Sequence, residues 1–327
     1  MRATSSLIRR EFAAYFTSPI GYVAVFSFLI LTGLLFNLAL RLLTEQGPRG
    51  VEFPMQVFLG GAESPVPALV AGVLFWGLFP AVTGILTSRL LAEERGSGTL
   101  EVLLTAPIRD WQVVLAKFAA CFGFYLFLWL LTLIYLPVLL DLHATWKAAF
   151  TPFSIAAIAG AAILLLALLS LIINTNGWVS FALLLAGVLP LGIGGYLHYS
   201  RDSEHLISIT AGIDPAPVLT SYIGIILAGA MFLALGLLVS SLVKSQLVAW
   251  MLALLLGLLF VLPSLLRWWF ENGTLGYSLV YFVSVPEHFR RSFTRGQLDT
   301  RPLVLYVSVM FFCLYMTVRS LEARRLR

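Results

Sequence analysis

Residues 89–117 read RLLAEERGSGTLEVLLTAPIRDWQVVLAK, a block that carries acidic and basic side chains between two long apolar runs. The rest of the chain is very different, because 60% of its 327 residues are hydrophobic and only 11% are charged. A charged segment of this length is too costly to bury in hydrocarbon. We therefore expect it to emerge on one side of a membrane, where a soluble partner can reach it.

The overall composition supports this view. The mean hydropathy is +0.94, whereas about a quarter of the residues are charged in an average soluble protein. The net charge of +5 does not call for nucleic acid, because the lysines and arginines stand mostly at the edges of apolar runs, where they meet lipid headgroups. Cys121 and Cys313 each lie inside an apolar run, which predicts buried thiols. The composition indicates one integral membrane domain, residues 1–327.

The positions of the spans follow from the charge-free intervals. A membrane-spanning helix needs about 20 apolar residues, and intervals of this kind predict eight spans, at 20–40, 66–88, 118–140, 153–173, 178–197, 217–243, 246–266 and 302–318. Residues 148–200 contain no Asp, Glu, Lys or Arg, and the interval is too long for a single crossing. The turn-forming run Asn174-Thr175-Asn176-Gly177 divides it into the pair 153–197. The distribution of lysines and arginines across the membrane fits a seven-span topology about as well as an eight-span one. The length of this interval, however, favours an all-α bundle of about eight helices with both termini cytoplasmic.

The first 19 residues predict an amphipathic helix that precedes the first span. Its apolar side is formed by Leu7, Ile8, Phe12, Tyr15 and Phe16. Its charged side, which we expect in water, comprises Arg9, Arg10 and Glu11. The run Thr17-Ser18-Pro19 is expected to end this helix. A simple anchor at the membrane edge would have the same composition.

Within residues 89–117, Gly96 and Gly98 are expected to interrupt the helix and Pro107 to end its second half. An apolar stripe lies beside three carboxylates in this block. The stripe is Leu100, Leu103 and Leu104, and the carboxylates are Glu93, Glu94 and Glu101. A solvated loop has no need of such a stripe, whereas docking into the groove of a partner does.

This block resembles the hallmark segment of ABC-2 type transporter permeases. The residues that carry the likeness are Arg89, Glu93, Glu94, Arg95, Gly98, Thr99, Leu100, Glu101, Leu104 and Pro107. The branch named for gliding-motility permeases is the most similar, and the permease of the copper-maturation system of nitrous oxide reductase is also similar. Other parts of the pattern are matched by Glu11 and residues 15–22, by 236–242 with Gln246, by 287–289, 295–296 and 299–301, and by 321–325, whereas about 141–214 show no match. Because the family pattern has six spans, the pair 153–197 is a departure from it.

The resemblance implies a permease of the bacterial inner membrane that pairs with a second copy or a paralogue and binds ABC ATP-binding subunits. It also admits an auxiliary extracytoplasmic or membrane protein. Coupling to the ATP-binding subunits would pass through residues 89–117 and through an elbow helix at residues 1–19, of which Arg9, Arg10, Glu11, Tyr15 and Phe16 match. The sequence contains no GxxxxGK[ST] motif, so ATP and Mg are expected on the partner, and this chain is expected to be no enzyme and to hold no cofactor.

Four alternatives remain open at this level. His198, Asp202, Glu204 and His205 have spacings that could hold a divalent metal, although a wet loop is the more ordinary interpretation. Within the outer loop 267–301, residues 286–299 form either an ordinary loop or short amphipathic helices, which the shared helical face of Phe289 and Phe293 favours. Gly33, Gly224, Gly229 and Gly236 are candidate points of close approach between two permease copies. Finally, a membrane scaffold that moves no substrate would show the same sequence features as an exporter.

Overall fold

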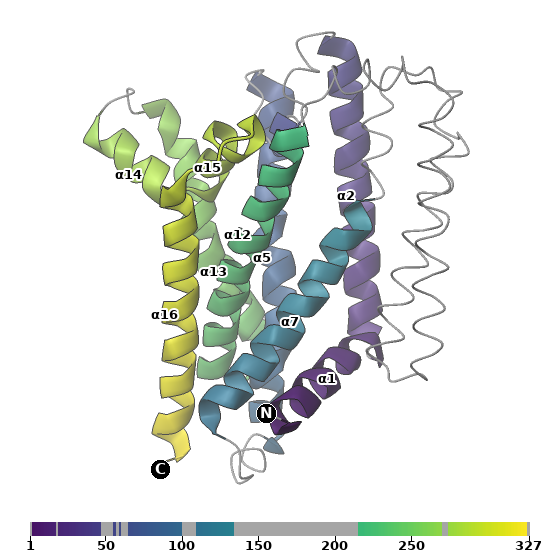
Figure 1. Cartoon of the computed structure of the whole chain (residues 1–327), viewed down its shortest axis with the longest axis vertical. Helices are drawn as coiled ribbons and strands as arrows, with labels where there is room; N and C mark the ends of the chain where they lie inside the picture. The colour runs from purple at the N-terminus through teal and green to yellow at the C-terminus, as the bar shows by residue number, and fades with distance from the viewer. Residues whose placement is uncertain are drawn as a thin grey trace. The chain divides into compact units, whose positions relative to one another are not determined.

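The structure is a computed structural model, and it describes residues 2–17, 19–46, 55–56, 59, 65–99, 109–133, 215–269 and 274–325. All of the regular elements in these ranges are helices (Figure 1). The predicted pair 153–197 and the candidate metal cluster at 198–205 lie outside the described residues. The count of eight spans therefore stays a prediction.

Most of the described helices agree closely with the apolar intervals of the sequence, but the helix at 110–132 begins eight residues before the predicted span 118–140. In chain order they are α1 (Arg2–Thr17), α2 (Pro19–Gln46), α5 (Pro65–Gly96), α7 (Asp110–Thr132), α12 (Pro215–Leu242), α13 (Gln246–Val261), η1 (Leu262–Trp269), α14 (Leu275–Val283), α15 (Val285–Arg291), η2 (Phe293–Arg295) and α16 (Thr300–Arg325). In the described part of the chain, five stretches are long and apolar enough to cross a membrane: Phe75–Gly96, Asp110–Thr132, Ala216–Leu242, Gln246–Leu266 and Thr300–Ala323. A shorter apolar stretch, Ala24–Asn37, lies in α2. The chain is a multi-pass membrane protein.

The chain divides into two compact units. The first comprises Met1–Glu11, Gly33–Tyr125 and Pro215–Arg327, and the second comprises Phe12–Thr32 and Leu126–Asp214. In the second unit, aromatic rings hold the described segments together, with ring centroids 5.2 Å apart for Phe16 and Phe127 and 5.3 Å apart for Phe28 and Trp129. Its described residues thus bury aromatic surface against one another.

The break between α1 and α2 falls where the sequence predicts it. Helix α1 ends at Thr17 and α2 begins at Pro19. A Cβ atom at Gly21 would overlap the carbonyl oxygen of Tyr15, so this close approach of backbone to backbone requires glycine. The role of α1 as an elbow helix stays a prediction.

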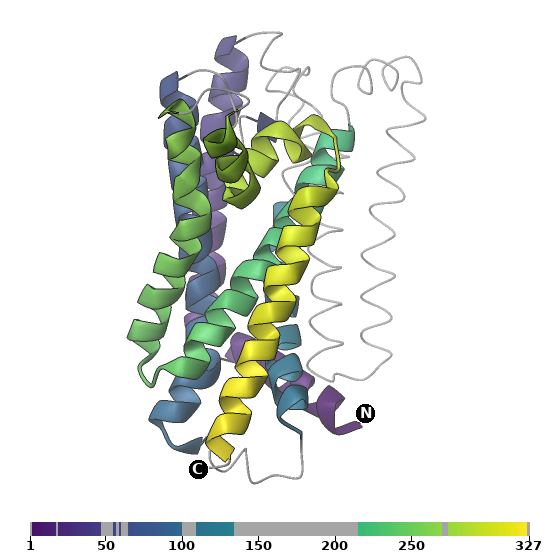
Figure 2. The same cartoon turned by 90° about the vertical axis from the view of Figure 1, so that its left-hand side faces the viewer.

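Helix α12 forms the centre of the first unit. It packs against α5, α13 and α16, and 78% of its span is buried, compared with 22% for the spans of α13 and α16. Figures 1 and 2 show α16 running beside α12 from the end that carries α15 to the C-terminus. Helices α13 and α16 expose large side chains such as Leu255, Leu259, Phe311 and Phe312. Apolar faces of this size fit contact with lipid or with another membrane protein.

Small residues allow the helices of the first unit to approach closely. On α13, Ala249, Ala253 and Gly257 are buried at every fourth position, and a Cβ at Gly257 would lie 2.5 Å from the Cβ of Pro80 on α5. Packing of small residues of this kind replaces the hydrophobic effect between helices in lipid.

The glycines of α12 face the chain's own helices, which corrects the prediction that they face a second permease copy. A Cβ at Gly224 would meet the rings of Phe289 and Phe293, one at Gly229 would meet Tyr125, and one at Gly236 would meet Thr87. These three positions are therefore filled by side chains of the same molecule.

Candidate functional site

The charged block consists largely of extensions of two spans. Helix α5 continues to Gly96, and α7 already begins at Asp110, so only residues 97–109 separate them. Beyond α5, Gly98 takes a left-handed conformation with φ 75°, the usual way for glycine to end a helix. This confirms the predicted interruption. Leu100, Glu101, Leu104 and Pro107 lie outside the described residues.

Lys117 lies inside α7 and is only 1% exposed. The predicted span 118–140 begins after Lys117, whereas α7 begins at Asp110, so Lys117 belongs to this helix and does not precede it. Its Nζ atom donates to Glu94 Oε1 of α5 at 2.6 Å and to Glu11 Oε2 of α1 at 3.3 Å. Burial of a charge is tolerated only where it is paired in this way. We call Glu11, Glu94 and Lys117 the Lys117 ion cluster; it joins three helices.

Glu11 also departs from the prediction that places it in water, because its side chain is only 12% exposed. The reason lies in its spacing. Leu7, Glu11 and Tyr15 follow one another at four-residue intervals, which places them on one side of the helix, and Leu7 and Tyr15 are both buried. Leu7 packs against Val113 and Ala116 of α7. The N-terminal half of α1 is thus attached to α7 by apolar contact and by an ion pair.

Both carboxylates of the cluster depend on nearby cations. Burial raises the pKa of Glu11, but the charges and hydrogen bonds of Lys117 and Arg10 outweigh this effect and hold that pKa below its ordinary value. Arg10 donates to Glu11 Oε1 at 2.7 Å, so both oxygens of Glu11 are bonded. The second oxygen of Glu94, Oε2, is buried and has no hydrogen-bond donor among the described residues. Glu94 is therefore held within the chain through its other oxygen, Oε1, by Lys117.

A hydroxyl group joins α12 to the same end of α5. The Ser240 Oγ atom accepts from the backbone N–H groups of Leu91 and Ala92 at 3.1 and 3.0 Å and donates to the Ser88 carbonyl at 3.1 Å. In a regular helix the Ala92 N–H pairs with the Ser88 carbonyl, so the hydroxyl bridges a backbone pair of α5. One turn later, Arg95 Nη1 donates to the Ser241 carbonyl at 3.1 Å. These hydrogen bonds would thus transmit a movement of the end of α5 to α12.

The short link between α12 and α13 lies at this end as well. A Cβ at Gly96 would be 3.0 Å from the carbonyl oxygen of Lys244. The eight-span prediction puts Lys244 and residues 89–117 on one side of the membrane, and their closeness agrees with it. Ser240 and Ser241 were not among the predicted site residues; the only sequence signal for them was the family likeness of residues 236–246.

The other predicted residues divide into inward and outward groups. The Glu93 side chain is 58% exposed and has only a loose ion pair with Arg89, at 4.0 Å. Gly98 and Thr99 are also exposed, as are Arg9 and Arg10. Tyr15 is buried and Phe16 half-buried. Glu93, Gly98 and Thr99 therefore offer an accessible surface beside the Lys117 ion cluster. Glu94 and Arg95, which lie between them in sequence, bond to groups within the chain.

A comparison with family models decides the class of the protein. The model of the ABC-2 family transporter protein matches residues 7–192, which is more than half of the chain. The chain belongs to the ABC-2 transporter family. It is accordingly a membrane transport component, a permease, and the match includes all three residues of the Lys117 ion cluster. Searches of curated proteins and of solved structures gave no significant match.

Proposed function

We propose that this chain is the permease subunit of an ATP-driven ABC-2 exporter, of the branch that includes the gliding-motility permeases and the permease for nitrous oxide reductase maturation. ATP would be hydrolysed, with Mg, on separate ATP-binding subunits. The membership of the ABC-2 family supports the permease role. The observation that carries the coupling proposal is the burial of Lys117 between Glu11 and Glu94, beside the point where residues 97–109 leave α5.

The coupling would use the contacts of the α5 end. A subunit that docks on residues 93–104 displaces the end of α5, and Lys117 passes this displacement to α7 and, with Glu11, to α1. Ser240 passes it to α12. Removing one partner of a buried ion pair costs about 3–5 kcal/mol, so these helices are expected to shift together and not to slide past one another.

The architecture of the complex follows from this mode of docking. Two ATP-binding subunits that close on each other each need a docking site, which calls for two permease copies or a copy and a paralogue. The exposed apolar faces of α13 and α16 offer surfaces for lipid or for that second copy. The chain would lie in the bacterial inner membrane, with its two termini and residues 97–109 in the cytoplasm, and an auxiliary extracytoplasmic protein would meet the opposite end.

The docking surface is tested best at Glu93. Charge reversal at Glu94 would break the Lys117 ion cluster and so confound docking with folding. The side chain of Glu93 is exposed and weakly paired. We propose to express the tagged full chain in its native host as wild type, Glu93→Lys and Glu322→Lys. Glu322 is 42% exposed and lies on α16, which makes it a control for the same charge change.

Affinity purification, followed by mass spectrometry and an ATPase assay, gives the readout. The wild type and Glu322→Lys should retain a P-loop ATP-binding protein at equal stoichiometry, and Glu93→Lys should lose most of it while its melting temperature is unchanged. Retention of the partner by Glu93→Lys, with unaltered ATPase activity, would contradict the proposed docking surface.

A further inference from the structure

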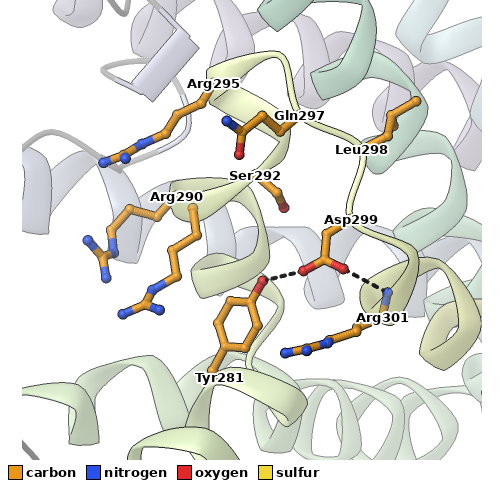
Figure 3. Close-up of a pocket in the computed structure, with 9 residues that line it drawn as sticks. Tyr281, Arg290, Ser292, Arg295, Gln297, Leu298, Asp299 and Arg301 are labelled. Carbon is orange, nitrogen blue, oxygen red and sulfur yellow. Dashed lines mark hydrogen bonds between the residues drawn. The ribbon is translucent and has the colours of Figure 1, made fainter. Parts of the chain in front are cut away.

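A second site lies at the end of the first unit opposite the Lys117 ion cluster. It is a cavity of about 560 Å³ between α14, α15, η2 and the start of α16 (Figure 3). Four of the nine residues that line it are arginines: Arg290, Arg291, Arg295 and Arg301. A single carboxylate, Asp299, opposes them, which leaves the lining with a net formal charge of +3.

Only part of this positive charge is neutralised by the chain itself. Arg290 donates to both oxygens of Glu287 over distances of 2.8 to 3.2 Å. In the described part of the chain, no ion pair joins Arg295 or Arg301 to a carboxylate. Burial, and after it the charge of Arg295, lowers the pKa of Arg291. Like charges gathered in this way are stabilised by an anion that binds between them.

Asp299 interacts with Arg301 through its charge, but both of its oxygens are bonded to other groups. Its Oδ2 accepts from the Tyr281 hydroxyl at 2.9 Å and its Oδ1 from the backbone N–H of Arg301 at 3.0 Å (Figure 3). The second bond caps the N-terminus of α16. The N–H of Arg301 is the main cause that lowers the pKa of Asp299, while burial and then Asp299 raise the pKa of Tyr281 to about 12.

The arginines stand on a rigid base. Phe289 and Phe293 are fully buried and pack on each other with centroids 4.9 Å apart, and the carbonyl of Phe293 accepts a hydrogen bond from Thr220 of α12. After η2 the chain turns at Gly296, whose φ of 78° favours glycine. The backbone that carries Arg290, Arg291 and Arg295 is thus held in place before any ligand arrives, which lowers the cost of binding.

The surroundings of the cavity indicate that the anion is carried by a lipid. The span Thr300–Ala323 begins within the lining. Arg290, Arg291 and Arg295 precede this span and Arg301 is its second residue, the places along the chain where headgroup contacts occur. Helix α14, which contributes Tyr281, exposes Leu275, Leu279 and Phe282. Their spacing of four and three residues forms one apolar stripe, as in helices that lie in the membrane interface. Leu298, in the lining itself, is 52% exposed.

We propose that this cavity binds the phosphate of an anionic phospholipid in the leaflet opposite the Lys117 ion cluster, with Arg295 and Arg301 as its main contacts. The site is independent of the docking of ATP-binding subunits. It would attach the α14–α15 end of the permease to the lipid surface and fix its depth there.

Native mass spectrometry of the delipidated full chain in detergent tests this proposal. The probes are short-chain phosphatidylglycerol, diacylglycerol with the same chains, glycerol phosphate and a polyglutamate peptide. Phosphatidylglycerol should bind, diacylglycerol should not, and glycerol phosphate should bind far more weakly. Because one charge-assisted contact contributes about tenfold in affinity, Arg295→Gln/Arg301→Gln should bind phosphatidylglycerol about a hundredfold more weakly.

Lys244→Gln/Arg319→Gln is the matched control, since it removes the same charge from two exposed positions at the other end of the first unit. The control should bind like the wild type. Equal loss of affinity in both double variants, or no loss in the pocket variant, would overturn the proposal. Tight binding of glycerol phosphate alone would indicate a soluble phosphoester, and preference for polyglutamate would indicate an acidic protein; either result would also overturn it. If Arg301→Gln lowers the melting temperature without lipid, Arg295→Gln alone should still weaken binding about tenfold.

Discussion

The Lys117 ion cluster leads to the sharpest prediction, that Lys117→Met strongly destabilises the protein. At an effective dielectric constant of about 20, the attraction of Lys117 to Glu94 across 2.6 Å is about 6 kcal/mol and that to Glu11 across 3.3 Å about 5 kcal/mol. Desolvation of a side chain that is 1% exposed offsets much of this. Loss of one partner from a buried pair costs about 3–5 kcal/mol. We expect the lower end, about 3 kcal/mol, because Glu94 is 23% exposed and Glu11 keeps Arg10.

Thermal unfolding of the detergent-purified full chain measures the effect. At about 2 °C for each kcal/mol, Lys117→Met should lower the melting temperature by about 6 °C. A double-mutant cycle with Glu94→Gln should give a coupling energy of about 2 kcal/mol, since each single change already breaks the shared pair. Arg319→Gln is the control, because its pair with Glu322 is 61% and 42% exposed and contributes at most about 0.5 kcal/mol.

Two results would refute the reasoning. The first is a melting temperature for Lys117→Met within about 1 °C of the wild type, as for an ordinary surface change. The second is simple additivity of Lys117→Met and Glu94→Gln, which would show that the two groups do not interact in the folded protein.

Two further predictions concern other parts of the first unit. Gly229→Ala should destabilise by about 2 kcal/mol, because its Cβ would overlap the Tyr125 ring, whereas Gly77→Ala, with open space around it, should not; equal melting temperatures of the two variants would contradict this packing. His288, buried and 2.9 Å from the Tyr306 hydroxyl, has its pKa lowered by burial to about 4. The imidazole of the unfolded chain has an ordinary pKa near 6.5, so below that pH unfolding takes up a proton. The contribution of neutral His288 to the free energy of unfolding is therefore complete above pH 6.5. It is lost as the pH falls toward 4, by up to about 3 kcal/mol. A pH series of thermal unfolding should show this loss in the wild type and a flatter profile in His288→Gln; parallel profiles would disprove it.

Much of the fold could be predicted from local sequence. The predicted span 246–266 coincides with the observed stretch Gln246–Leu266, and 217–243 differs from α12 by no more than two residues at either end. The residues at and near these boundaries are enough to predict them, because hydrocarbon excludes charge and a span requires about 20 apolar residues in a row. The helix end at Gly96 and Gly98 is local too, since glycine adopts a left-handed backbone that other residues avoid. The sequence also favours short helices within 286–299, where α15 and η2 form, although Phe289 and Phe293 face the protein core and not the membrane.

The candidate site was predictable only in part. Glu93, Glu94 and Arg95 were identified within the charged block, but their roles were not distinguished, because adjacent residues of a helix point in different directions and only neighbouring helices decide which of them is buried. The burial of Glu11 could have been found from its four-residue spacing to Leu7 and Tyr15. Ser240 could not, because a serine near a helix end has many ordinary partners.

By itself, the sequence determined the membrane class, several of the helical spans and the charged segment between α5 and α7, since each depends on the solvation of contiguous residues. Tertiary structure alone decided where Lys117 lies. Seen in sequence, a lysine beside an apolar run marks the end of a span, because a lone buried charge is too costly. Its carboxylate partners are 23 and 106 residues away, and only the packing of α1 and α5 against α7 brings them close enough for the charge to be buried.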